Sequence, residues 1–416
     1  MPQMIESTEP RWKDLAIQAG RVFSPSAPID ELSLFAGRDT QIRTVVDAIN
    51  QKGQHAIVYG ERGVGKTSLS NVLHGFLGQQ TFPVVAPRVQ CEAQDTFDKV
   101  WRRVFDKIEL TREKKTMRIQ APVARESYVA SELVAGDVDP DDVRRILAII
   151  AKSAVPIVII DEFDRLSKER RRPFADTIKT LSDHAVAATV VLVGVADSVD
   201  ELVHEHQSVE RALVQVSMPR MSGDEIRQII NTGLLKLGMF IHPDALQRIV
   251  VLSQGLPHYT HLIGLYSARA ALDAKTLEIT EDVVGTAIEK AVEGAQQSIS
   301  SAWHQAIRSQ RKDNLFGDVL LSCALAETDQ QNTFAAQDVR VPMREITGKP
   351  YAITSFAQNL NDFCDDKRGP ILQRTGTARK YRYRFVNPLM QPFVIMQGFR
   401  QNKITKALLN RLHKRD

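Results

Sequence analysis

The chain has 416 residues, 43% of them hydrophobic and 25% charged, which are ordinary proportions for a soluble globular protein. At about 150 residues per domain, this length predicts two or three domains. The longest near-apolar run, AVAATVVLVGVA (185–196), is shorter than the roughly 18 residues that suggest a membrane span, and the first residues lack a signal-peptide core. We therefore expect a cytosolic protein with no membrane partner. Three dispersed cysteines favour neither a disulfide framework nor a thiolate metal site.

The net charge of +4 is unevenly distributed along the chain. Residues 370–416 contain eleven Lys or Arg and one acid and so carry +10, which leaves −6 on residues 1–369. A basic C-terminal segment on a slightly acidic body favours a polyanionic partner, although it is also compatible with a solubilising tail.

The strongest motif lies at 60–67, where GERGVGKT fits the phosphate-binding pattern GxxxxGK[ST] between an apolar strand and a helical pattern. Glycines let the loop backbone close around phosphate, and the following helix N-terminus adds positive potential. Lys66 is expected to reach the β- and γ-phosphates of ATP, and the Thr67 hydroxyl to bind Mg²⁺. The predicted nucleotide-binding residues here are Gly60, Glu61, Arg62, Gly63, Val64, Gly65, Lys66, Thr67 and Ser68.

A partner acid is predicted in VPIVIIDEFDRL (155–166). The continuous apolar run is typical of a parallel strand covered on both faces, and ligands of such sheets lie at the C-terminal ends of the strands. Asp161 is expected to hold Mg²⁺ through water, and Glu162 to act as general base toward an attacking water. Neighbouring strand residues point to opposite faces, so the chain must turn at this point for both to serve one site.

The order of these motifs resembles the AAA+ superfamily over residues 30–295. LFAGRD (34–39) looks like the stretch that contacts adenine in AAA+ and STAND ATPases, which implies a contact from Phe35. VVLVGVADSVDEL (190–202) resembles the sensor-1 strand, with Asp197 or Ser198 at the tip in place of the usual Asn or Thr. The segment 207–234 looks like that of origin-recognition and helicase-loader proteins, in which Arg211 matches the arginine finger. That resemblance implies an oligomer with ATP at subunit interfaces.

The resemblance implies a helical lid after residue 220, and four stretches with helical spacing follow there, the first of them capped by Ser222. His258 stands where origin-recognition relatives place a sensor-2 arginine. Gly255-Leu256-Pro257 instead resembles the Gly-x-Pro motif of STAND ATPases, whose proline lies near the adenine. The resemblance therefore implies adenine contacts from Pro257 and His258 and slow turnover, while Pro257 equally suits the first position of a helix.

The C-terminal part reads as helices followed by a hairpin, and ITSFAQNLNDFCDD (353–366) is predicted to be an amphipathic helix with Ile353, Phe356, Leu360 and Phe363 on one face. This order is that of a winged helix, and origin-recognition AAA+ proteins carry one in the same place. In ARKYRYRF, strict alternation puts Tyr381, Tyr383 and Phe385 on one face, predicted to pack on the core. The predicted phosphate contacts are Arg374, Arg379, Lys380, Arg382 and Arg384.

The expected fold is α/β: a P-loop AAA+ parallel sheet core with an α-helical lid and a C-terminal winged-helix domain. The expected domains are an N-terminal extension (1–30), the core (31–220, with an insertion or mobile loop at about 111–138), the lid (221–295), the winged helix (296–395) and a basic tail (396–416). We expect an ATP- and Mg²⁺-dependent oligomeric switch that binds DNA, as an initiator, loader or transposition-type regulator. The alternatives are a STAND-like signalling or scaffold ATPase of a bacterial defence or conflict system, which gates a separate protein effector, and a nucleotide-binding protein without turnover.

Overall fold

A computed structural model gives the fold and describes residues 9–25, 37–77, 83–114, 124–196, 198–202, 209, 211–310, 314–329, 331–377, 380–404 and 408. The chain divides into two compact units. The sheet unit comprises Pro28–Glu61 and Gly65–Pro219, and the helical unit comprises Met1–Ala27, Arg62–Val64 and Arg220–Asp416.

The sheet unit is built on a parallel sheet with strand order β2-β6-β7-β1-β8, and β3 also pairs with β6. Its strands are β1 (His55–Gly60), β2 (Val84–Val85), β3 (Arg88–Gln90), β6 (Val155–Asp161), β7 (Thr189–Val195) and β8 (Leu213–Ser217). The central strands are almost wholly buried, as their continuous apolar runs predict. The predicted parallel α/β core is confirmed.

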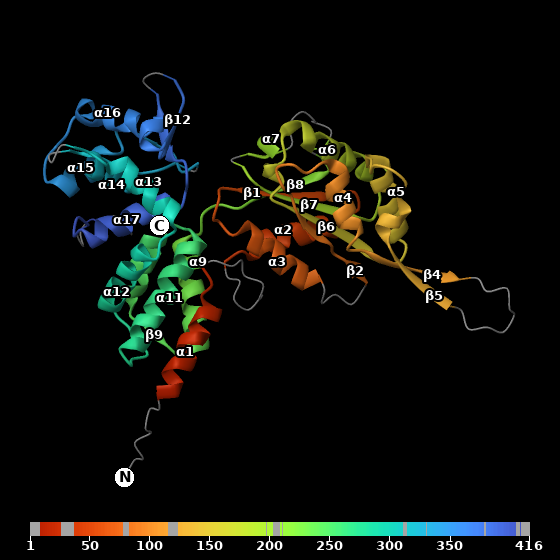
Figure 1. Ribbon diagram of the computed structural model, residues 1–416, viewed down its shortest axis with the longest axis horizontal. Coiled ribbons are helices and arrows are strands. Elements are labelled where there is room, and N and C mark those ends of the chain that lie inside the picture. Colours follow the sequence, from red (N-terminus) through yellow and green to blue (C-terminus); the bar gives the residue numbers. More distant parts are fainter. Residues whose placement is uncertain are drawn as a thin grey trace, which may run out of the picture. The chain divides into compact units, whose positions relative to one another are not determined.

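Helices cover both faces of this sheet (Figure 1). They are α2 (Asp39–Ile49), α3 (Lys66–Leu77), α4 (Phe97–Phe105), α5 (Pro140–Ile150), α6 (Lys168–Asp183) and the short α7 (Val199–Leu202), with a 3₁₀ turn, η3 (Phe163–Arg165), after β6. Apolar side chains of α4, α5 and α6 form one hydrophobic cluster with residues of β1, β6 and β7 such as Ile57, Ile160 and Leu192. The core therefore fixes where the C-terminal ends of these strands lie.

The segment at about 111–138, expected to be an insertion or a mobile loop, contains regular structure, so the loop alternative is wrong. β4 (Glu109–Lys114) and β5 (Ala124–Val129) pair as an antiparallel hairpin that extends away from the central sheet, and the 3₁₀ turn η2 (Ala130–Leu133) follows (Figure 1). The strands hold polar residues such as ELTREK, so composition suggested a loop. The hydrogen bonds between the two strands join backbone groups and form whatever side chains the strands carry. A polar composition therefore did not exclude a hairpin.

In the helical unit, the four predicted lid helices are present, and α1 packs on them. The helices are α1 (Glu9–Val22), α9 (Gly223–Leu237), α10 (Pro243–Ser253), α11 (Pro257–Asp273), α12 (Glu281–Glu293) and α13 (Gln297–Ile307), with the short parallel pair β9 (Phe240–Ile241) and β10 (Glu278–Ile279). Ser222 caps α9 in a capping box with Glu225, as predicted. The buried Phe23 ring lies where side chains at Gly233 or Gly264 would stand. Helix α1 and Phe23 thus form part of the core of these helices.

The C-terminal domain (316–400) has the predicted helices and hairpin, with additions. Its elements are α14 (Phe316–Ala324), β11 (Phe334–Ala335), α15 (Arg340–Thr347), α16 (Ile353–Asp362), η4 (Asp366–Arg368), β12 (Leu372–Thr375), β13 (Arg382–Phe385) and α17 (Met390–Arg400). The three strands form an antiparallel sheet in the order β11-β13-β12. Within this unit, the Tyr259 hydroxyl of α11 donates to the Leu389 carbonyl at 2.7 Å, so the lid and this domain are connected.

Two details of this domain were not predicted. Ile353 begins α16 and is 37% exposed, because the first turn of the helix projects beyond the core that covers Phe356, Leu360 and Phe363. α17 has no counterpart among the predicted elements and runs across the expected start of the basic tail at residue 396. The proline in MQPFVIMQGFR lies in the first turn, where a helix tolerates it, and nearly every residue of α17 is buried.

Candidate nucleotide-binding site

The phosphate-binding motif joins β1 to α3, as the sequence predicts: β1 ends at Gly60 and α3 begins at Lys66. The Lys66 ammonium donates to the carbonyls of Gly60 at 2.9 Å and Glu61 at 2.8 Å, and the residue is 8% exposed. The lysine is therefore held against its own loop, beside the positive N-terminal end of α3. Phosphate oxygens at this position would provide acceptors of greater charge than two carbonyls.

Gly60 meets the end of β8 so closely that no side chain fits. A Cβ at this position would lie 2.4 Å from the Met218 carbonyl oxygen, and φ is 155°. Tyr59 and Met218 are joined by a backbone hydrogen bond of 2.7 Å, which holds the two strand ends together. Gly65, with φ at 96°, lets the chain turn into α3. The other loop positions, Arg62, Gly63 and Val64, complete the connection, and Thr67 and Ser68 lie in the first turn of α3.

The acidic pair follows directly from the end of β6. Asp161 is the last strand residue and is 2% exposed, and its Oδ1 accepts the backbone N–H of Glu162 at 2.8 Å. Glu162 adopts the left-handed conformation, with φ at 53° and ψ at 35°. For a residue other than glycine this conformation is uncommon, and such strain gathers at functional sites. The turn redirects the chain between the two acids, as a shared site requires.

Asp164 has a position that the sequence analysis did not single out. Its Oδ1 accepts the N–H of Val195, the last residue of β7, at 2.8 Å. Asp164 also lies 3.2 Å from where a side chain at Gly194 would begin. The turn after the acidic pair thus ties the end of β6 to the end of β7, where the predicted sensor segment starts. No local pattern signals this hydrogen bond, because its two residues are 31 apart in sequence.

The structure describes three of the residues predicted to act as sensors or to contact adenine: Ser198, Pro257 and His258. Ser198 is partly buried just before α7, whereas Asp197 and Phe35 lie outside the described residues. Pro257 occupies the first turn of α11, and His258 forms a hydrogen bond through Nδ1 with the Pro25 carbonyl at 2.7 Å. Burial lowers the pKa of His258, so the ring is a weaker cation than an arginine would be. Within the helical unit, the imidazole therefore fastens the N-terminal segment to α11.

Arg211 stands exposed in the turn before β8, and its carbonyl accepts the side-chain amide of Gln54 at 3.0 Å. An exposed guanidinium at this position is compatible with action on a neighbouring subunit. Its role as an arginine finger stays a prediction.

The cationic residues of the hairpin are only partly available to a partner. Arg382 forms an ion pair with Asp329 at 2.9 Å and donates to Thr333, while Arg384 bonds Gln373 across the strands. Arg374 lies over the Tyr381 ring at 4.3 Å and is exposed, as is Lys380. Arg379 lies outside the described residues. Tyr383 and Phe385 are buried, as the alternation predicts.

The residues present fit a Mg²⁺-bound nucleotide. Thr67 and Asn71 are one turn apart and share a face of α3, and the Arg88 guanidinium contacts both Asn71 and Asp161. Through Arg88, the carboxylate of Asp161 at the end of β6 is linked to the face of α3 that carries Asn71, one turn after Thr67. Mg²⁺ binds few protein ligands and takes the rest from phosphate and water, so one hydroxyl and one buried carboxylate suffice.

A P-loop after β1, an acidic pair after β6 and a parallel sheet covered on both faces together define a P-loop NTPase with the AAA+ fold. The model of the family Novel STAND NTPase 1 matches residues 28–332. The chain therefore belongs to the Novel STAND NTPase 1 family. No curated protein sequence matches it.

Comparison with solved structures finds similar chains. A Walker-type ATPase of Pyrococcus abyssi is similar over 90% of this chain and 99% of its own, with 13% identity and a TM-score of 0.51. The ORC2 protein of Aeropyrum pernix is similar over 92% of this chain and 98% of its own, with 13% identity and a TM-score of 0.48. Along the described part of this chain, no helix is both long and apolar enough to cross a membrane.

Proposed function

We propose that this protein is an ATP-binding and slowly hydrolysing molecular switch that assembles with copies of itself and binds DNA through its C-terminal domain. The observation that carries the proposal is the arrangement at the ends of β1 and β6. The buried Lys66 ammonium, the first turn of α3 and the Asp161–Glu162 pair lie at the same edge of the sheet. That arrangement suits a nucleoside triphosphate.

In this proposal each side chain has a defined task. Lys66 exchanges its two carbonyl partners for β- and γ-phosphate oxygens, and loop N–H groups orient the phosphates. Thr67 and Asp161 would hold Mg²⁺, which neutralises phosphate charge when bound. Glu162 takes a proton from the attacking water, since its carboxylate is half exposed at the strand end. Arg211 of one copy supplies positive charge at the nucleotide of the next.

DNA as the partner is favoured by the charge of the C-terminal segment and by the exposed Arg374 and Lys380 beside the hairpin turn. The helices α14, α15 and α16 followed by β12 and β13 have the order of a winged helix, in which such residues lie along phosphates. Because Arg382 is bound to Asp329, the cationic surface is smaller than the sequence suggested.

A second candidate function is a STAND-type switch that gates a separate protein effector. Two observations favour it: membership of the Novel STAND NTPase 1 family, and the engagement of Arg382 within the domain. In this case the C-terminal domain binds protein rather than DNA, with the same ATP chemistry in the sheet unit.

One experiment separates these proposals. The full chain is sized by light scattering with ADP and with a non-hydrolysable ATP analogue, each with and without duplex DNA. A larger species with the ATP analogue that also carries DNA supports the first function. Assembly without DNA at low salt supports the effector-gating function, and an unchanged monomer that binds neither nucleotide would overturn both.

A further inference from the structure

The carboxylate proposed to hold Mg²⁺ already has a cationic partner in this structure. Nη2 of Arg88 donates to Oδ2 of Asp161 at 2.8 Å, and the side chains are 21% and 3% exposed. We propose that Arg88 is the resident counter-ion of Asp161, which competes with Mg²⁺ for that carboxylate and so sets the Mg²⁺ concentration at which nucleotide is bound. This inference rests on the nucleotide-binding function proposed above.

Arg88 is placed for this task by its strand. It begins β3, which pairs with β6 so that Arg88 lies beside Ile159 and Gln90 beside Asp161. Its Nη1 also donates to the side-chain oxygen of Asn71 on α3. One planar guanidinium therefore bridges the helix of the phosphate-binding loop and the end of β6, a geometry that a lysine ammonium cannot reproduce.

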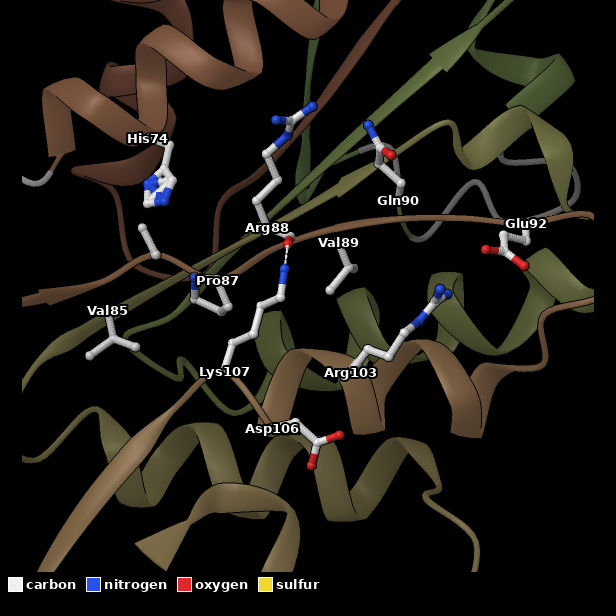
Figure 2. Close-up of a pocket in the computed structure, with 11 residues that line it drawn as sticks. His74, Val85, Pro87, Arg88, Val89, Gln90, Glu92, Arg103, Asp106 and Lys107 are labelled. Atoms are coloured by element: carbon white, nitrogen blue, oxygen red, sulfur yellow. Dashed lines mark hydrogen bonds between the residues drawn. The ribbon is translucent and has the colours of Figure 1, made fainter. Parts of the chain in front are cut away.

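The backbone of Arg88 is fixed from the opposite side. Lys107 donates through Nζ to the Arg88 carbonyl at 2.5 Å, and Figure 2 shows the Arg88 side chain extending away from Lys107. Both residues line a pocket of about 900 Å³ along β3 and the end of α4, together with His74 and Arg103. The pocket gives solvent a path to Arg88, so its side chain has room to leave Asp161.

Asp161 remains oriented when Arg88 is removed. Its Oδ1 accepts the backbone N–H of Glu162 at 2.8 Å, a hydrogen bond that does not involve Arg88. What changes is charge: a nearly buried carboxylate then stands without its cation. Such a group is costly in the metal-free protein and attracts a divalent cation more strongly. Removal of Arg88 is therefore expected to weaken the metal-free fold and to strengthen the response to Mg²⁺.

The test titrates Mg²⁺ into the full chain with a fluorescent ADP analogue, after removal of metal by EDTA. For Arg88→Met we expect half-maximal binding at a Mg²⁺ concentration lower than for the wild type by about threefold to thirtyfold. Thermal unfolding in EDTA should occur at a lower temperature, and Mg²⁺ with ADP should raise that temperature by more than it does in the wild type. Arg88→Lys keeps a cation but cannot bridge Asn71 and Asp161, so its Mg²⁺ requirement should lie between those of the wild type and Arg88→Met.

The matched control is Arg103→Met, which removes another arginine whose carboxylate partner, Asp95, is largely buried. It should weaken the fold without changing the Mg²⁺ requirement. If Arg88→Met does not fold, Asn71→Ala serves instead, since it removes only the second anchor of Arg88 and should lower the requirement by a smaller factor. An unchanged requirement in these variants, or an equal shift in Arg103→Met, overturns the role of Arg88 while nucleotide binding stands. A wild type that binds no ADP at any Mg²⁺ concentration overturns the nucleotide function as well.

Discussion

Glu162 and Arg165 form an ion pair, in which Oε2 of the glutamate accepts a hydrogen bond from Nη1 of the arginine at 2.8 Å. The glutamate is 43% exposed and has a left-handed backbone, whereas the Asp161 that precedes it is buried. Two adjacent carboxylates thus have different surroundings. The buried one suits a fixed metal ligand, and the exposed one has access to water.

Glu162→Gln is expected to retain nucleotide binding and to lower the rate of phosphate release by about a hundredfold or more, since an amide cannot accept the proton. Phosphate release and ADP-analogue binding are measured side by side. Equal release by the variant and the wild type would remove Glu162 as the base.

Lys66→Ala is expected to weaken binding of the ATP analogue by about tenfold to a hundredfold, because the variant cannot form the charge-assisted hydrogen bond to phosphate. The neighbouring carbonyls of Gly60 and Glu61 become available to water, so the fold should persist. The control is Lys179→Ala on α6, which removes an exposed lysine away from the loop. Similar affinities for the two variants, measured by fluorescence titration, would contradict the assignment.

Gly60→Ala should destabilise the sheet unit by about 2 to 4 kcal/mol, because the new methyl group meets the Met218 carbonyl in an unfavourable backbone conformation. Gly75→Ala is the matched control within α3, where a side chain meets nothing within 4 Å. Alanine favours the helix there by about 0.5 to 1 kcal/mol. The free energy of unfolding measured in urea should therefore decrease for Gly60→Ala and increase for Gly75→Ala.

Because His55 is buried, we expect the protein to become less stable in acid. The ring is fully buried, its Nδ1 accepts the Val190 N–H at 3.0 Å, and burial lowers its pKa from 6.5 to about 4. Between these two pH values the unfolded chain therefore binds a proton that the folded chain does not. Stability present above pH 6.5 is lost as the pH falls toward 4, by up to about 3 kcal/mol.

Thermal unfolding of the wild type and His55→Asn between pH 7 and pH 4 measures this effect. At pH 7 the variant should be less stable than the wild type, because the buried imidazole packs well. Between pH 7 and pH 4 its stability should decrease by less than that of the wild type. Parallel pH profiles for the two proteins would show that other groups cause the acid sensitivity.

Arg374→Glu combined with Lys380→Glu is expected to weaken duplex DNA binding and to reduce its dependence on salt concentration, by about one unit of log–log slope for each phosphate that is no longer neutralised. Arg382→Glu is the comparison, because it breaks the pair with Asp329 and should chiefly reduce thermal stability. Binding is measured by fluorescence anisotropy at several salt concentrations. Unchanged binding in the double variant would favour a protein partner.

Local sequence patterns were enough to predict the parallel sheet, the phosphate-binding loop, the acidic pair, the lid helices and the buried face of the last hairpin. Apolar runs, a glycine spacing, a capping serine and an alternation of two each depend on neighbouring residues alone. The helix α17 and the hairpin β4–β5 escaped prediction because a proline and a polar composition resemble loop signals.

The tertiary structure alone decides which side chains meet across the sheet, because the contacting residues are far apart in sequence. Arg88 is 73 residues from Asp161, and Asp164 is 31 residues from Val195, yet each pair is joined by a hydrogen bond. Likewise Arg382 reaches Asp329 because β13 lies beside β11. Such pairs depend on strand order and register, which long-range packing fixes and no local pattern encodes.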